Sequence, residues 1–219
     1  LKSLRQRIRL DQQLERIFPS VYVDDILIVP SWEEIKEEDK DKMILHIDPG
    51  TAFGTGMHET TQLVIRQLKK YVKPGIELLD VGTGSGILGI TALKLGAGHV
   101  VGTDLDPCAV PAVQDNKEAN QIVDDTFDMM IGNIIDDKEV QDQVGYEKYD
   151  IVAANILADV LVPLTPVIVH QMKKGAYYIT SGILDVKEEV VKEAVQKAGL
   201  TLVEVTRQGE WVCVTARKD

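Results

Sequence analysis

The sequence of 219 residues predicts an α/β protein with a mostly parallel, twisted sheet, helices on both faces and an antiparallel hairpin strand at its end. Three observations lead to this fold class. From about residue 44 onward, short apolar segments alternate with segments of helical spacing. A glycine-rich turn joins one apolar segment to the helix that follows it. The last two apolar segments are joined through residues 208–210, which is typical of a hairpin.

Residues 1–43 are expected to form a connector ahead of the main domain. Residues 1–18 are basic and carry apolar side chains at helical spacing, which predicts an amphipathic helix that ends at Pro19. This helix has two interpretations, a connector that packs on a neighbouring domain or a simple surface helix. Residues 26–30 predict a short strand, and the acidic stretch over residues 33–41 predicts a solvated loop.

The main domain, expected over residues 44–219, is assigned its elements from apolar segments and their flanking turn residues. The expected strands cover residues 76–81, 99–104, 127–131, 150–154, 176–181, 201–207 and 211–216. The expected helices include one that ends at Tyr71 and others over residues 86–95, 106–120, 158–172 and 185–198. Between residues 131 and 150 the acidic sequence predicts a looping connection.

Two of these helices carry recognisable start signals. Asp106 and Pro107 offer an N-cap followed by a proline at the first helical position. Asp185 and Glu188 have the spacing of a capping box. The helix after that box is expected to bury one face, formed by Val186, Val190, Ala194 and Ala198.

Composition limits the class of protein further. Hydrophobic residues at 44% and charged residues at 27% exclude collagen and global disorder. The net charge of −11 disfavours direct nucleic-acid binding, because phosphate repels an acidic surface. No apolar run has the length of a membrane span, and no secretory signal opens the chain. The distant cysteines Cys108 and Cys213 disfavour a disulfide framework or a zinc knuckle and favour a reducing cytoplasm.

The segment over residues 79–86, LDVGTGSG, ends a strand and begins a helix. Its glycines, among them Gly82 and Gly84, allow a tight turn and let a ligand approach the backbone. Asp104, at the end of the next expected strand, can accept both hydroxyl protons of a ribose. The glycines alone would equally fit a tight strand–helix turn, but with Asp104 they predict a nucleoside-binding crevice. A dinucleotide fingerprint is disfavoured, since Ile87 stands where its third glycine is required.

The turn and Asp104 together resemble the S-adenosylmethionine sites of Rossmann-like class I methyltransferases, and the terminal hairpin resembles the last strands of that family. This resemblance implies the fold and S-adenosyl-L-methionine as the cofactor. Asp80 could reach the amino group of the cofactor through water, but it is expected rather to order the glycine turn.

Residues 48–61, DPGTAFGTGMHETT, form a second glycine-rich segment that leads into a helix. By its residues alone it fits a flexible loop with a capped helix as well as a lid over a cofactor, and His58 fits a capping or surface residue better than a base. The segment closely resembles the PrmA-type lysine methyltransferases of ribosomal large-subunit protein eleven, whose pattern DPG-x-AFGTG-x-H-x-TT is matched at every fixed position. Further matches lie at residues 153–158, 181–184 and 210–211. The resemblance covers roughly residues 44–219 in order.

The PrmA-type resemblance implies a cytoplasmic protein methyltransferase that acts on lysine or other amino groups of a ribosomal large-subunit stalk protein. It implies cofactor contacts at Thr61, Gly82, Gly84, Asp104 and Asn155. Asn155 is also the candidate catalytic residue, since an amide oxygen can hold an amine by hydrogen bonds. No metal is expected, because no His, Cys or Asp cluster has ligand spacing.

Alternatives to this interpretation remain at several points. Asn155 also suits a helix N-cap, and Trp211 is expected to pack in the core or at a sheet edge. Asn155-Ile156-Leu157 departs from the NPPY motif, which disfavours glutamine and adenine as substrates. The chain could instead methylate another protein or a small molecule, or bind S-adenosylmethionine without catalysis. PrmA-type enzymes usually carry an additional N-terminal substrate-recognition domain that is not evident here, so we expect weak methylation by this chain alone.

Overall fold

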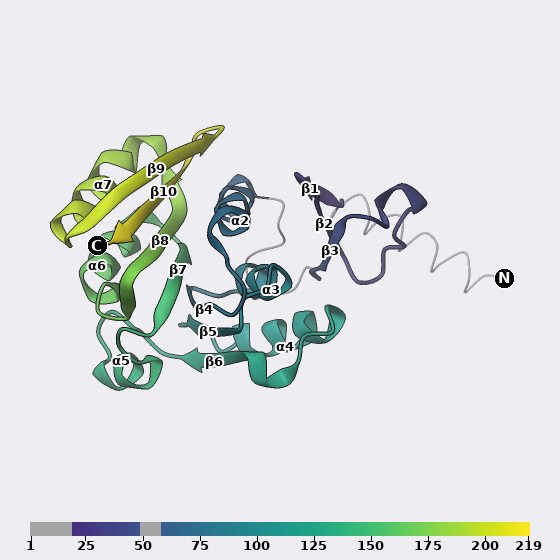
Figure 1. Cartoon of the computed structure of the whole chain (residues 1–219), viewed down its shortest axis with the longest axis horizontal. Coiled ribbons are helices and arrows are strands. Elements are labelled where there is room, and N and C mark those ends of the chain that lie inside the picture. Colours follow the sequence, from purple (N-terminus) through teal and green to yellow (C-terminus); the bar gives the residue numbers. More distant parts are fainter. Residues whose placement is uncertain (1–18, 49–57) are drawn as a thin grey trace.

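Two sheets organise residues 19–48 and 58–219, which are the residues that this computed structural model describes (Figure 1). The helix expected over residues 1–18 and most of the glycine-rich segment over residues 48–61, for which a lid was one of two interpretations, lie outside the described residues. The smaller sheet lies toward the amino-terminal end of the chain, and the larger sheet contains all the strands of the main domain (Figure 1).

The smaller sheet has three strands, of which the sequence predicted only the middle one. Strand β1 (Val21–Val23) pairs antiparallel with β2 (Ile26–Val29), and β2 pairs in parallel with β3 (Met43–His46). All four residues of β2 are buried, because the sheet packs against the main domain. The acidic segment between β2 and β3 is largely irregular, with one short 3-10 turn (Glu37–Asp39).

The larger sheet has seven strands in the order β6-β5-β4-β7-β8-β10-β9, so the predicted α/β architecture is confirmed. Only β10 runs opposite to the other six strands, and it lies one position inside the edge, which β9 forms. The strands are β4 (Glu77–Val81), β5 (His99–Asp104), β6 (Phe127–Ile131), β7 (Tyr149–Asn155), β8 (Met172–Leu184), β9 (Leu200–Gln208) and β10 (Trp211–Lys218).

Helices cover both faces of this sheet (Figure 1). On one face lie α2 (Glu59–Tyr71), α3 (Ile87–Lys94) and α4 (Ala109–Ala119), whose buried side chains share one core with the smaller sheet. On the other face lie α5 (Lys138–Val144), α6 (Ala158–Ile168) and α7 (Glu188–Lys197). None of the helices within the described residues is long and apolar enough to cross a membrane.

The structure corrects several expected boundaries. The predicted loop between β6 and β7 contains α5, whose start is capped by the Asp137 carboxylate, which accepts from two backbone N–H groups. Helix α4 begins at Ala109, because the Asp106 side chain instead closes a tight turn onto the N–H of Cys108. Helix α6 ends four residues before the predicted position, since Met172 already belongs to β8.

The expected capping box before α7 is wrong. Asp185 accepts from the adjacent N–H of Val186 within a 3-10 turn, and the Glu188 carboxylate turns away to bind the Arg207 guanidinium. This turn changes the phase of the helix that follows. Val191 and Val195 therefore face the core, whereas Val186 is 82% exposed.

Candidate functional site

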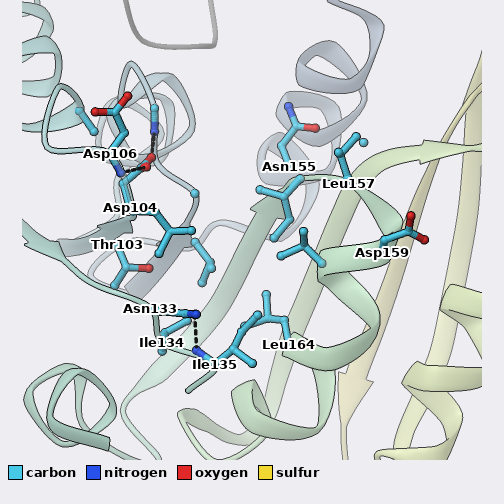
Figure 2. A pocket seen from close by; sticks show the side chains of 18 of the residues that line it. Thr103, Asp104, Asp106, Asn133, Ile134, Ile135, Asn155, Leu157, Asp159 and Leu164 are labelled. Carbon is cyan, nitrogen blue, oxygen red and sulfur yellow. Dashed lines mark hydrogen bonds between the residues drawn. The ribbon is translucent and has the colours of Figure 1, made fainter. Parts of the chain in front are cut away.

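A pocket of about 1010 Å³ opens at the carboxyl ends of the parallel strands (Figure 2). Ligands bind at this edge of open α/β sheets, because the strand-to-helix loops diverge there. The described residues that line it are His58, Thr60, Val81, Gly82, Gly84, Thr103, Asp104, Leu105, Asp106, Ala109, Gly132, Asn133, Ile134, Ile135, Asp136, Asn155, Ile156, Leu157, Asp159, Val160, Pro163, Leu164, Gly182 and Trp211. Of the predicted site residues, Gly82, Gly84, Asp104 and Asn155 are brought together here.

The glycine turn lies at the floor of the pocket, between β4 and α3. Gly82, Gly84 and Gly86 have φ angles of 75°, 55° and 83°, which side chains other than glycine adopt only with strain. The N–H groups of Gly82 and Thr83 both donate to the carbonyl oxygen of Thr103, at 2.8 and 3.1 Å. The turn is thereby attached to β5, and its backbone is open to the pocket at Gly82 and Gly84.

Asp104 ends β5 beside this turn. One of its carboxylate oxygens accepts from the Gly84 N–H at 2.8 Å, and the other accepts from the Asp106 N–H at 2.9 Å. An ionised carboxylate offers about four acceptor positions, so two remain for hydroxyl groups of a ligand. The structure thus holds Asp104 in a fixed orientation at the pocket wall (Figure 2).

Asp80 lies beneath the turn and orders it through its backbone. Its carbonyl oxygen accepts from the Thr83 hydroxyl at 2.9 Å, so the backbone of Asp80 orders the turn. Its carboxyl group is fully buried, and neither oxygen makes a hydrogen bond of ordinary geometry. Burial raises the pKa of Asp80 to about 8, with the nearby charge of Asp104 adding to the shift and the Gly89 N–H opposing it. The carboxyl group therefore carries a proton at neutral pH.

Asn155 ends β7 on the side of the pocket opposite Asp104 (Figure 2). Its Nδ2 donates to the Thr61 hydroxyl oxygen at 3.2 Å, whereas its buried Oδ1 has no partner. Thr61 is completely buried, so it lies behind Asn155, and its neighbour Thr60 lines the pocket instead. The alternative of a helix cap is wrong for Asn155, because α6 begins at Ala158 after Leu157 as its N-cap.

Two aromatic rings close one end of the pocket. His58 caps α2 as expected, since its Nδ1 accepts from the Thr60 N–H at 3.3 Å. Its ring meets that of Trp211 edge to face, with 4.8 Å between the centroids. Trp211 packs on the core, as expected, and also forms part of the pocket wall.

An apolar wall formed mainly by α6 is the part of the site that sequence reasoning missed. It includes Leu157 at the N-cap of α6, Leu164 within that helix and Ile134 from the loop after β6 (Figure 2). Val160 of α6 also lines the pocket. Leu157, two residues after the end of β7, is 67% exposed and presents its apolar side chain to the pocket. The signal available in the sequence was the apolar pair Ile156 and Leu157, which directly follows Asn155 at the end of β7.

Within residues 19–48 and 58–219, no group of three or more His, Cys, Asp or Glu side chains could hold a metal ion.

Comparison with known proteins identifies the family. The family described as Ribosomal protein L11 methyltransferase (PrmA) matches residues 11–219. This chain belongs to the PrmA family. The ribosomal protein L11 methyltransferase of Agathobacter rectalis is 55% identical over 207 residues, which are 93% of this chain and 64% of that protein. The protein of the same name from Lachnospira eligens is 58% identical over 197 residues, 90% of this chain and 62% of that protein.

The chain therefore spans somewhat less than two thirds of the length of these PrmA relatives. The crystal structure of ribosomal protein L11 methylase from Lactobacillus delbrueckii subsp. bulgaricus superposes with a TM-score of 0.81 at 31% identity, over 91% of this chain and 99% of that one. An S-adenosylmethionine dependent methyltransferase from Mesorhizobium loti shares the fold alone, with a TM-score of 0.57 at 11% identity over 71% and 96% of the two chains. The fold is the Rossmann-like fold of class I methyltransferases.

The sequence segments that carry the PrmA resemblance converge on the pocket. The described part of residues 48–61 contributes His58 and Thr60, and residues 153–158 contribute Asn155. Residues 181–184 contribute Gly182, and residues 210–211 contribute Trp211. These segments lie far apart in the chain, so their meeting at one cavity indicates that the family pattern describes a single site.

Proposed function

We propose that this chain is an S-adenosylmethionine-dependent N-methyltransferase that modifies lysine or other amino groups of ribosomal protein L11, a stalk protein of the large subunit. The observation that carries the proposal is the convergence of Asp104, the glycine turn and Asn155 on one pocket in a member of the PrmA family. A ribosomal protein as the substrate would locate the reaction in the cytoplasm.

The pocket has the donor and acceptor groups that S-adenosylmethionine requires. Asp104 retains acceptor positions for the two ribose hydroxyls, and the backbone at Gly82 and Gly84 allows close approach. Gly132 and Asn133 lie at the pocket beside Ile134, where a flat and largely apolar base can be held. When bound, S-adenosylmethionine supplies an electrophilic methyl group on a sulfonium. The chain itself has to supply orientation.

Asn155 is suited to orient the amine that receives the methyl group. Its Nδ2 is held by the Thr61 hydroxyl, and this bond fixes the amide plane. Its Oδ1 is a buried acceptor without a partner, so a ligand N–H that reaches it removes the cost of an unpaired polar group. A hydrogen bond from an amine N–H to this oxygen orients the lone pair of the amine nitrogen. The Asn155 amide itself cannot act as a base at neutral pH. We therefore assign Asn155 to alignment of an amine that arrives unprotonated.

Incubation with radiolabelled S-adenosylmethionine and purified ribosomal proteins tests this function. We expect weak labelling of L11, which mass spectrometry should map to amino groups. Asp104→Ala should lose most of the labelling, whereas Asp115→Asn, on the exposed surface of α4, should retain it. Label on a different protein would refute the substrate assignment. Cofactor binding without any transfer would favour a non-catalytic binding module.

A further inference from the structure

We propose that Asn116 is a positioning residue that couples the smaller, amino-terminal sheet to the cofactor-binding glycine turn. The identity of the cofactor rests on the proposed function, whereas the coupling itself rests on hydrogen bonds of the described residues. In consequence, docking of the smaller sheet should raise the affinity of the turn for its ligand.

Asn116 projects from α4 into the interface between three segments and is only 2% exposed. Its Oδ1 accepts from the backbone N–H of Asp48 at 3.0 Å, just after β3. Its Nδ2 donates to the backbone carbonyl of Ser85 at 2.8 Å, inside the glycine turn. One amide thus joins two backbone segments that are far apart in sequence. Because this amide is buried, water cannot replace either hydrogen bond if it is lost.

The bond to Ser85 attaches the turn to α4, in addition to its attachment to β5. Ser85 lies between Gly84, which lines the pocket, and Gly86, whose added Cβ would come within 3.0 Å of Val113 on α4. Both glycines adopt left-handed φ angles, and glycine backbone has wide conformational freedom unless neighbours restrict it. Thr103 fixes the turn on the β5 side through its carbonyl oxygen. The helix α4, through Asn116, fixes it on the other side.

The Asp48 end of this connection is also fixed. Its carboxylate accepts from both the backbone N–H and the hydroxyl of Ser31, each at 2.6 Å. Ser31 follows β2 closely, and Asp48 follows β3, so the ends of two adjacent strands are tied together. Movement of the smaller sheet relative to α4 must therefore act on Asn116, and through it on the carbonyl of Ser85.

Asn120, one turn later on α4, provides a matched control. Its Oδ1 accepts from the His46 N–H at 2.9 Å, and its Nδ2 donates to the His46 carbonyl at 2.6 Å. It therefore binds β3 in the same manner and is similarly buried, at 6% exposed. None of its hydrogen bonds reaches the glycine turn. Loss of Asn120 should loosen β3 at His46 and leave both side-chain hydrogen bonds of Asn116, to Asp48 and to Ser85, in place.

Asn116→Asp and Asn120→Asp form the test pair. Each change keeps an acceptor for the β3-side N–H, replaces one amide donor and adds one charge at a buried position of α4. Titration calorimetry with S-adenosylhomocysteine should show about tenfold weaker binding for Asn116→Asp, the scale of one lost hydrogen bond, and less than a twofold change for Asn120→Asp. Amide exchange over residues 82–86 of the ligand-free protein should become faster in Asn116→Asp alone.

The outcomes distinguish a failure of this inference from a failure of the proposed function. If the unaltered protein fails to bind S-adenosylhomocysteine, the cofactor assignment is wrong, and amide exchange at the turn still decides the coupling. Equal losses of affinity in both variants, or unchanged exchange over residues 82–86 in Asn116→Asp, would overturn the role of Asn116. Should either charged variant fail to fold, the neutral pair Asn116→Ser and Asn120→Ser carries the same expectation.

Discussion

Replacing Asp80 with asparagine should stabilise the ligand-free protein, and the gain should grow as the pH rises. The carboxyl group of Asp80 is fully buried and unpaired, which raises its pKa from 3.8 to about 8. At pH values between these two pKa values, the folded protein retains a proton on Asp80 that the unfolded chain releases. The unfolding free energy of the unaltered protein therefore falls as the pH rises through this range.

The size of the effect follows from the shift. Each pKa unit corresponds to about 1.4 kcal/mol, so Asp80 lowers stability by about 1.4 kcal/mol for every pH unit between pH 5 and pH 7. An asparagine side chain at this position would have nearly the same shape without the ionisable group. The difference in unfolding free energy between Asp80→Asn and the unaltered protein should thus increase by about 3 kcal/mol from pH 5 to pH 7.

Urea unfolding followed by circular dichroism at pH 5, 6 and 7 measures this difference. Other titrating groups are the same in both proteins and cancel in the comparison. Asp115→Asn removes a carboxylate from the exposed surface of α4 and should change stability by the same small amount at each pH. If the advantage of Asp80→Asn does not vary with pH, Asp80 is ionised in the folded protein and the argument from burial is refuted.

Three further substitutions test other parts of the structure. Asp104→Ala should weaken S-adenosylhomocysteine binding by about 1–3 kcal/mol, because it removes hydrogen bonds to a charged acceptor, and unchanged affinity in calorimetry would contradict its role on the ribose. Arg207→Met should lower the unfolding free energy by about 1–2 kcal/mol at pH 7. The guanidinium holds the pKa of Glu188 below its usual value, so this loss should shrink as acid protonates Glu188, and an equal loss at pH 3 would exclude the ion pair as its cause. Gly182→Ala should destabilise the protein by more than about 2 kcal/mol, since φ is 83° and the new Cβ would lie 2.4 Å from the Ile156 carbonyl oxygen, and an unchanged melting temperature would show that this strand end can relax.

The main sheet was predictable from the sequence because its signals are local. Each central strand is a short apolar run between turn residues, and parallel strands buried on both faces require such runs. The strand ends were equally visible, which is why Asp104 and Asn155 could be named as site residues in advance. Their placement on opposite sides of one pocket required the strand order, which no local pattern contains.

The elements that escaped prediction depend on contacts between distant residues. Strand β3 is a four-residue segment whose last residue, His46, is bound by Asn120, 74 positions away. The buried face of α7 was misplaced because the 3-10 turn before it shifts the helical phase, and Glu188 prefers Arg207 on β9 to a capping role. In both cases a side chain finds a partner that sequence spacing does not indicate.

The strand order also explains why Asp104 and Asn155 lie on opposite sides of the glycine turn. Strand β4 lies between β5 and β7, and the chain passes from β4 to β5 on one side before it returns to β7 on the other. The glycine turn after β4 therefore lies at the point where the order reverses, with Asp104 on one flank and Asn155 on the other. A ligand whose ribose is held by Asp104 has to extend across the turn toward Asn155. In the proposed function, the residues that hold the cofactor are thus separated by one strand from the residue that aligns the amine, and substitution of Asn155 should affect transfer more than cofactor binding.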